Sequence, residues 1–211
     1  MQRKRLSKNS EEDTRKTVNI GVLAVQGNFR EHCSILNRLK VRNIEVRTKK
    51  DLEQCDGLII PGGESTAISK LMKEEGIDQE LKKSKLPVFG TCAGLILLAK
   101  NISDNGKKES HSIKLMDITV DRNYYGSQLD SFTSTIKFMK RRIKAVFIRA
   151  PKIINVGSAV IVLGKHNNDP VIVQENQYLG AAFHPELIGE TKLHEYFVKI
   201  IEKYKSRNSQ G

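Results

Sequence analysis

Tryptophan is missing from this sequence of 211 residues, and aromatic residues of all kinds make up only 6% of it. The apolar runs are all much shorter than the roughly 20 residues that a membrane-spanning helix needs, so the sequence predicts no contact with a membrane. The first residues are charged and no apolar stretch follows them, so we expect no secretory signal peptide. Internal repeats and low-complexity segments are also missing, which excludes a repeat architecture.

Cysteine is scarce as well. The three cysteines, Cys33, Cys55 and Cys92, form an odd number with no Cys-x-x-Cys pair, and the histidines show no metal-binding spacing. This pattern argues against a disulfide framework and against a zinc site. It favours a reducing compartment, so we expect a cytoplasmic protein.

The charge is strongly one-sided, with 36 Lys and Arg against 24 Asp and Glu and a formal net charge of +12. Such a balance permits nucleic-acid binding. The basic residues are spread over the N-terminal segment, residues 137–152 and the C-terminal segment, however, and no aromatic residues alternate with them as in a base-stacking surface. We therefore interpret most of them as solvated faces, and nothing except the charge favours a nucleic-acid partner.

The chain divides into three parts. Residues 1–17 are polar and charged and predict a disordered basic tail. Residues 18–205 have the length and apolar content of a single α/β domain. Residues 206–211 are expected to fray.

Short apolar runs alternate with helical patterns through the first half of the domain. This alternation predicts a three-layer sandwich, in which helices flank a mainly parallel central sheet with right-handed crossovers. Strands are predicted at 19–25, 44–46, 56–60 and 86–89, and helices begin at Phe29, after Ser65 and at Ile77. Residues 101–112 look turn-like. Strands without helices between them follow at 113–120, 132–138, 145–148, 159–163, 171–174 and 178–183, which predicts an antiparallel extension of the main sheet, and a closing helix follows.

The stretch from Val88 to Ala99 predicts a reactive cysteine. A buried strand leads into Gly90-Thr91-Cys92-Ala93-Gly94 and then into an apolar helix. Gly-x-Cys-x-Gly is the cysteine form of the nucleophile elbow, a tight turn that lifts the nucleophile above a sheet. A thiol at a helix N-terminus is favoured as the reactive thiolate. The alternative is a buried core cysteine, which would not need glycines on both sides.

A cysteine nucleophile needs a base, and the base needs a group to orient it. Of the five histidines, His184 is the best candidate because it follows an apolar strand and precedes a proline. In extended geometry His184 and Glu186 point to the same side, so Glu186 could orient the imidazole. We expect His32 to pack or lie on the surface, His194 to face outward on the closing helix, and His111 and His166 to lie in polar turns.

The loop Pro61-Gly62-Gly63-Glu64-Ser65 follows a predicted strand. Its adjacent glycines let backbone N–H groups turn toward a ligand, which suits an oxyanion hole with the N–H of Ala93 as the second donor. A phosphate-binding loop and a helix N-cap at Ser65 are the alternatives.

Three motifs, Gly-Thr-Cys-Ala-Gly, Pro-Gly-Gly-Glu-Ser-Thr and Phe-His-Pro-Glu-Leu, resemble the class I, triad-type glutamine amidotransferases in order and spacing. Further segments resemble the glutaminase subunits of pyridoxal 5′-phosphate synthase. These segments are Gly21–Gly27, Arg122–Gly126, Asp130–Phe132 and Phe147–Pro151. The resemblance runs from about residue 19 to about residue 204. It departs at Ser127, where the family commonly has arginine.

The resemblance implies hydrolysis of L-glutamine to L-glutamate and ammonia by a Cys-His-Glu triad of Cys92, His184 and Glu186, with no cofactor and no metal. The ammonia would pass to a synthase (lyase) subunit in a hetero-oligomer that makes pyridoxal 5′-phosphate, and the glutaminase would be active mainly when docked there. Glutamine would contact Gly63, Glu64, Ser65, Arg122, Ile148 and Arg149, with Gly63 and Ala93 at the oxyanion.

Other functions stay open at this point. The chain could be the glutaminase of another amidotransferase, or a stand-alone cysteine hydrolase that turns over without a partner. A non-catalytic regulatory homologue is disfavoured, because all three members of the predicted triad are present.

Overall fold

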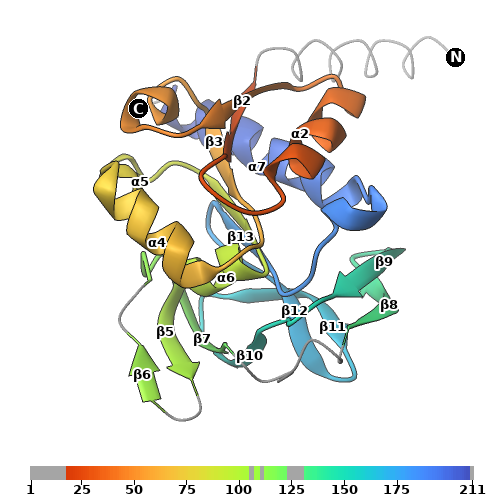
Figure 1. The fold of residues 1–211 in the computed structure, drawn as a ribbon. Coiled ribbons are helices and arrows are strands. Elements are labelled where there is room, and N and C mark those ends of the chain that lie inside the picture. Colours follow the sequence, from red (N-terminus) through yellow and green to blue (C-terminus); the bar gives the residue numbers. More distant parts are fainter. Residues whose placement is uncertain (1–17, 105–106, 110–111, 123–130, 210–211) are drawn as a thin grey trace, which may run out of the picture.

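The structure is a computed structural model, and it describes residues 18–104, 107–109, 112–122 and 131–209. The tail predicted at 1–17, His111 and the Ser127 departure lie outside these residues. The described strands form two sheets, one with nine strands in the order β2-β1-β3-β4-β13-β12-β11-β8-β9 and one with four in the order β10-β7-β5-β6 (Figure 1).

Five strands make up the parallel half of the large sheet. In spatial order they are β2 (Arg42–Val46), β1 (Asn19–Leu23), β3 (Gly57–Ile60), β4 (Val88–Thr91) and β13 (Tyr178–Ala181). Every residue of β3, β4 and β13 is buried. Strands that helices cover on both faces read as continuous apolar runs, which is why the sequence predicts them.

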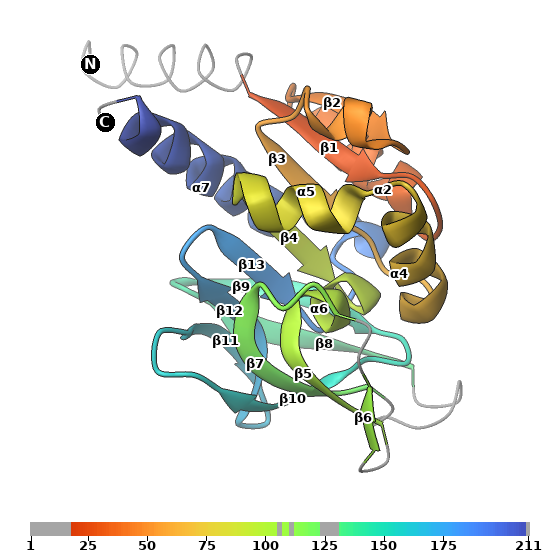
Figure 2. The ribbon, with the colours of Figure 1, turned by 90° about the vertical axis from the view of Figure 1, so that its left-hand side faces the viewer.

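Helices cover both faces of this half. On one side lie α2 (Phe29–Arg38) and α7 (Lys192–Asn208), and on the other lie α4 (Ser65–Glu74), α5 (Ile77–Ser84) and α6 (Ala93–Leu98) (Figures 1 and 2). Phe89 packs on Phe197 of α7 with ring centroids 5.8 Å apart, whereas the next residue, Gly90, lies against Gly94 of α6. Because successive residues of a strand point to opposite faces of the sheet, neighbouring residues of β4 contact helices on its two sides.

Four antiparallel strands complete the large sheet and confirm the predicted extension. They are β12 (Asp169–Glu175), β11 (Ile161–His166), β8 (Phe132–Phe138) and β9 (Arg141–Phe147). The bounds of β8 are the predicted ones. His166 is the last residue of β11, so its prediction in a polar turn is wrong.

The second sheet was not expected. It contains β10 (Lys152–Val156), β7 (Met116–Asp121), β5 (Ala99–Asp104) and β6 (Lys107–Glu109), and in Figure 2 it lies alongside the antiparallel half of the large sheet. The turn-like prediction for 101–112 is therefore wrong over β5 and β6. The strand predicted at 113–120 exists as β7 but pairs in parallel with β5 in this separate sheet. The sequence gives no clear strand signal over β5, because few of its side chains are apolar.

The helices differ from the predicted ones in two places. The short helix α3 (Lys49–Leu52) was missed, and it begins with a capping box in which Thr48 and Asp51 satisfy each other's backbone N–H groups. At the other end of the chain α7 continues to Asn208, beyond the expected limit at residue 205. Within the described part of the chain no helix is both long and apolar enough to span a membrane.

Candidate active site

Three loops meet at the carboxyl ends of adjacent strands. The Gly62–Ser65 loop follows β3, the cysteine turn follows β4, and the His184 segment follows β13, so the central strand of the three carries the cysteine. In parallel sheets such ends form ligand sites. Here they border a cavity of about 830 Å³, which is lined by Gln26, Asn28, Gly63, Glu64, Ser65, Cys92, Ala93, Ile96, Arg122, Ile148, Arg149 and His184.

The cysteine turn has the conformation that the sequence predicts. Cys92 lies between β4 and α6 with φ of 48° and ψ of −103°, an uncommon backbone conformation for a residue with a side chain. Its N–H donates to the carbonyl of Ala181 at 2.9 Å, which fixes the turn to β13. A Cβ at Gly94 would lie 2.1 Å from the carbonyl oxygen of Ile60. The backbone around the turn is so close that only glycine fits at Gly90 and Gly94.

The other two cysteines are unsuited to nucleophilic work. Burial, together with nearby carboxylates, raises the pKa of Cys33 to about 11 and the pKa of Cys55 to about 12. Both thiols are thus protonated at neutral pH, and the thiolate is the nucleophilic form. Cys92, by contrast, lines the cavity, and its sulfur lies 3.8 Å from the carbonyl oxygen of Ile148.

His184 and Glu186 are joined by a short hydrogen bond, with Nδ1 of the imidazole 2.7 Å from Oε1 of the carboxylate. Burial by itself would lower the pKa of His184, but Cys92 and Glu186 outweigh it and raise this pKa to about 10. Burial would raise the pKa of Glu186, but His32 and His184 lower it to about 2. At neutral pH the two groups form an imidazolium–carboxylate pair.

The reason given for this pairing from sequence was wrong. The chain does not stay extended after β13: Pro185 has helical backbone angles, and Glu186 begins the 3₁₀-helix η1 (Glu186–Ile188). A helical turn, and not strand alternation, brings Glu186 back beneath His184.

The glycine loop is held in place by the turn after β1. Oε1 of Gln26 accepts the N–H of Glu64 at 2.8 Å, and the N–H of Asn28 donates to the carbonyl of Gly62 at 3.2 Å. Between them, Gly27 has φ of 91° and passes so close to Gly62 that a side chain would collide with its carbonyl oxygen. Gly63, Glu64 and Ser65 all face the cavity. Glu64 occupies the N-cap of α4, so the N-cap alternative for Ser65 is excluded.

Arg122 reaches the cavity from the end of β7. Its Nη2 donates to the hydroxyl of Thr66 at 3.0 Å, and this hydroxyl in turn lies 3.3 Å from Oε1 of Glu64. The second sheet therefore supplies a cation to a site that is otherwise built by the first. Ile148 and Arg149, which follow β9, complete the predicted set at the cavity.

Four residues near the site were missed or misjudged. Gln26 and Asn28 line the cavity, and Nδ2 of Asn28 donates to Oε1 of Glu186 at 3.3 Å. His32 and His194 are completely buried, so the outward placement of His194 was wrong. For Gln26 and Asn28, the sequence signal was their place in a polar turn directly after an apolar strand. For His32 and His194 there was no such signal, because each is a single polar residue on an amphipathic helix.

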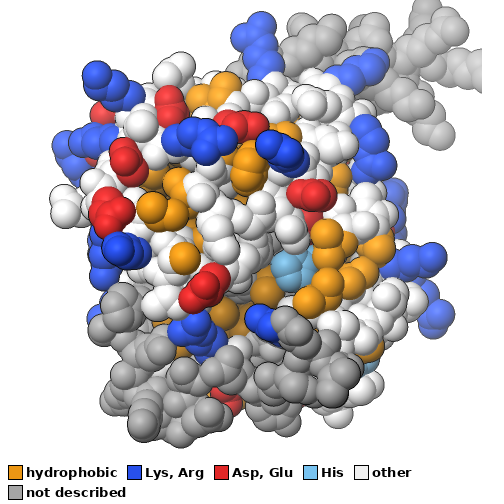
Figure 3. Space-filling model, in the orientation of Figure 1, with side chains coloured by type: hydrophobic (Ala, Val, Ile, Leu, Met, Phe, Trp, Pro, Cys, Tyr) orange, Lys and Arg blue, Asp and Glu red, His pale blue; other side chains and the backbone are white. Residues whose placement is uncertain are grey.

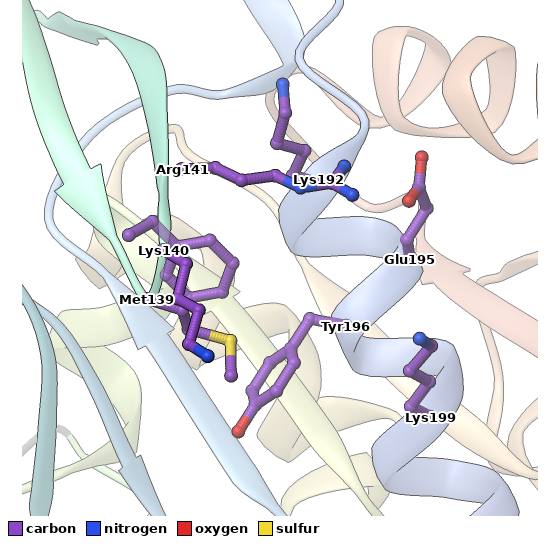
Figure 4. A pocket seen from close by; sticks show the side chains of 8 residues that line it. Met139, Lys140, Arg141, Lys192, Glu195, Tyr196 and Lys199 are labelled. Atoms are coloured by element: carbon purple, nitrogen blue, oxygen red, sulfur yellow. The ribbon is translucent and has the colours of Figure 1, made fainter.

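A second cavity, of about 310 Å³, lies between the β8–β9 hairpin and α7. It is lined by the basic side chains of Lys140, Arg141, Lys192 and Lys199, together with Glu195 and Tyr196 (Figure 4). None of the cysteines and histidines that the structure describes lines it. Elsewhere on the visible surface Lys and Arg are scattered among acidic side chains, as expected of solvated faces (Figure 3).

A cysteine at a strand-to-helix turn, beside a histidine from the next parallel strand, is the arrangement expected of a glutamine amidotransferase. The solved "Crystal structure of glutamine amidotransferase" superposes with a TM-score of 0.82 at 42% identity, over 87% of this chain and 98% of that one. The model of the SNO glutamine amidotransferase family matches residues 22–203, and the chain belongs to this family.

Curated relatives agree with this assignment. "Pyridoxal 5'-phosphate synthase subunit PdxT" of Fervidobacterium nodosum is 47% identical over 88% of this chain and 98% of its own length. The protein of the same name from Oenococcus oeni is 46% identical over 90% of this chain and 100% of its own length. The resemblance found in the sequence motifs is therefore confirmed.

Proposed function

We propose that this chain hydrolyses L-glutamine to L-glutamate and ammonia, with Cys92 as nucleophile, His184 as general base and acid, and Glu186 as the group that orients His184. The observation that carries this proposal is the shared cavity of Cys92 and His184, with the 2.7 Å bond from His184 to Glu186 behind it. Family membership supplies the reaction class.

The reaction divides into two acyl transfers. The Cys92 thiolate forms a bond to the amide carbon of glutamine, the carbon–nitrogen bond breaks, and the His184 imidazolium gives its proton to the departing ammonia. Neutral His184 then takes a proton from water, the hydroxyl adds to the thioester, and the carbon–sulfur bond breaks to release glutamate and the thiolate. In both steps the negative oxygen lies on the N–H groups of Ala93 and Gly63.

The cavity is suited to an amino acid with a charged end. Arg122 would bind the α-carboxylate, since a guanidinium engages a carboxylate with two hydrogen bonds. Glu64, Ser65, Ile148 and Arg149 would surround the rest of the molecule. The reaction itself requires no metal and no organic cofactor.

We propose further that the chain is the glutaminase subunit of a pyridoxal 5′-phosphate synthase and passes its ammonia to a synthase subunit in a hetero-oligomer. The names of its relatives support this assignment. A cytoplasmic location is proposed with it, because the three free thiols suit a reducing compartment.

The test is ammonia release from L-glutamine, measured with and without a pyridoxal 5′-phosphate synthase subunit. Release that rises when the synthase subunit is added is the expected result. Equal release without any partner would favour a stand-alone hydrolase, and capture of a different synthase in a pull-down would favour another amidotransferase. Either result would contradict the proposed assembly.

A further inference from the structure

Two histidines that the proposed reaction does not use lie next to Glu186, the group proposed to orient His184. His32 on α2 and His194 on α7 have no exposed surface, although they are 162 residues apart in the sequence. Nδ1 of His32 lies 2.8 Å from Nε2 of His194, so the two imidazoles share a hydrogen bond across the contact of these helices. Phe89 packs edge-on against both rings.

The other nitrogen of His32 points toward the triad. Its Nε2 is 3.5 Å from Oε2 of Glu186 and 3.3 Å from the hydroxyl of Thr91, the residue before the nucleophile. Oε1 of Glu186 is already engaged by His184 and Asn28. Oε2 is buried and makes no hydrogen bond within the described residues. The imidazole of His32 is thus the polar group that the structure places against this oxygen.

The direction of the hydrogen bonds follows from burial and from the charge of Glu186. Burial lowers the pKa of both His32 and His194 and, for His32, outweighs the nearby Glu186 carboxylate, so at neutral pH each ring is neutral and carries one N–H and one lone pair; only in acid does His32 bear the charge that opposes protonation of Glu186. The carboxylate of Glu186 decides the direction. A lone pair on Nε2 of His32 would face the negative Oε2 of Glu186 at 3.5 Å, so Nε2 of His32 carries the proton and its Nδ1 carries the lone pair. Nδ1 of His194 makes no hydrogen bond within the described residues, although the backbone of Glu190 acts to raise the pKa of His194. Nε2–H of His194 then donates to Nδ1 of His32, which leaves Nε2–H of His32 directed at Glu186 and Thr91.

We propose that His32 is a positioning residue for the glutaminase reaction: it holds the second oxygen of Glu186, and His194 fixes the tautomer in which it does so. This inference rests on the proposed function of the triad. With His184 at one oxygen and His32 3.5 Å from the other, the Glu186 carboxylate has one orientation, and it holds the His184 ring in the orientation in which the other nitrogen faces Cys92. A carboxylate free to turn would leave His184 with several orientations, and misplacement of a catalytic group by about 1 Å costs up to about 100-fold in rate.

The two amide isosteres of histidine separate these contacts. In His32→Gln the side-chain amide reaches the position of Nε2, beside Glu186, and in His32→Asn it reaches only the position of Nδ1, beside His194. Both variants are polar and smaller than histidine, so they disturb packing to a similar degree. Phe89→Leu is the control for packing, because it loosens both rings and removes no polar atom.

Ammonia release is measured for each variant in complex with the synthase subunit. We expect kcat to fall about 10–100-fold in His32→Asn with KM unchanged, and to stay within about threefold of the parent in His32→Gln and Phe89→Leu. The pKa of His184, which Glu186 raises, should be lower in His32→Asn than in the parent when the ring is followed by NMR, since a loosened Glu186 stabilises the imidazolium less. A role in folding alone would not move it.

Equal kcat values in His32→Asn and the parent would overturn the proposal, and so would equal losses in the Asn and Gln variants or a matching loss in Phe89→Leu. If His32→Asn does not fold, His194→Leu replaces it, with an expected fall of about threefold to tenfold that must vanish when His32→Leu is already present. A parent protein without glutaminase activity would instead refute the proposed function, so the two failures are distinguishable.

Discussion

Gly62 lies directly beneath the ring of His184. A Cβ at this position would be 2.2 Å from Cε1 of the imidazole and 2.8 Å from Nδ1, the atom bonded to Glu186. The loop that carries Gly63, Glu64 and Ser65, the residues proposed to bind glutamine, therefore also packs against the ring of the proposed base. The room for the imidazole depends on a position with no side chain.

Gly62→Ala should accordingly displace His184. The backbone angles at Gly62 are not in the left-handed region, so the added methyl group acts through contact with the ring. We expect kcat for ammonia release to fall at least tenfold, since the imidazole must move out of line with Cys92.

Gly76→Ala is the matched control. A Cβ at Gly76 would meet no atom within 4 Å, but its φ of 68° makes alanine strained there. This variant should lose about 1 kcal/mol in the free energy of unfolding and keep its kcat. Equal kcat values for the two alanine variants would contradict the role assigned to the loop.

Arg122→Met should raise KM for glutamine. A hydrogen bond to a charged group contributes about 1.5–3 kcal/mol, which corresponds to a rise of roughly 10–150-fold, and kcat should change much less. Steady-state kinetics on the complex measures both constants. Arg142→Met, which removes an exposed arginine from β9, should leave KM unchanged, and similar KM values in the two variants would count against Arg122 as the carboxylate anchor.

Acid should weaken the fold through His194. Burial, followed by the neighbouring His32, lowers the pKa of His194 from 6.5 to about 3, although Glu186 acts in the opposite direction. Below pH 6.5 the unfolded chain binds a proton at this site that the native state rejects, so stability falls as the pH drops from 6.5 toward 3.

His194→Phe should remove part of this slope. Urea midpoints measured between pH 7 and pH 4 should fall less steeply for His194→Phe than for the parent, whereas Phe197→Leu should lower the midpoint by a constant amount. Parallel curves for His194→Phe and the parent would show that the proton-linked loss arises elsewhere.

The parts of this molecule that could be predicted from sequence are those that local chemistry determines. Gly90 and Gly94 mark the cysteine turn because no larger residue fits, and the apolar runs of β3, β4 and β13 mark strands covered on both faces. Together with the resemblance of the motifs, these signals predict Cys92 as the nucleophile and His184 as its base, and both side chains line one cavity.

The parts that escaped prediction depend on distant partners. The second sheet depends on β5 and β7 pairing across a stretch of polar residues. His32 and His194 read as single polar positions on two separate helices, and their burial is set only when α2 and α7 meet. Glu186 was chosen correctly as the partner of His184, but for the wrong local geometry, because the helical turn after Pro185 has no clear signal in three residues.

The central claim is that Cys92 attacks glutamine, and ammonia release by the Cys92→Ala variant tests it most directly. The assay compares parent and variant at saturating glutamine with the synthase subunit present, while thermal unfolding and a binding assay establish that the variant folds and docks. We predict that release falls to the level without enzyme and that fold and docking are unchanged. Release at the rate of the parent by folded, docked Cys92→Ala would contradict the account.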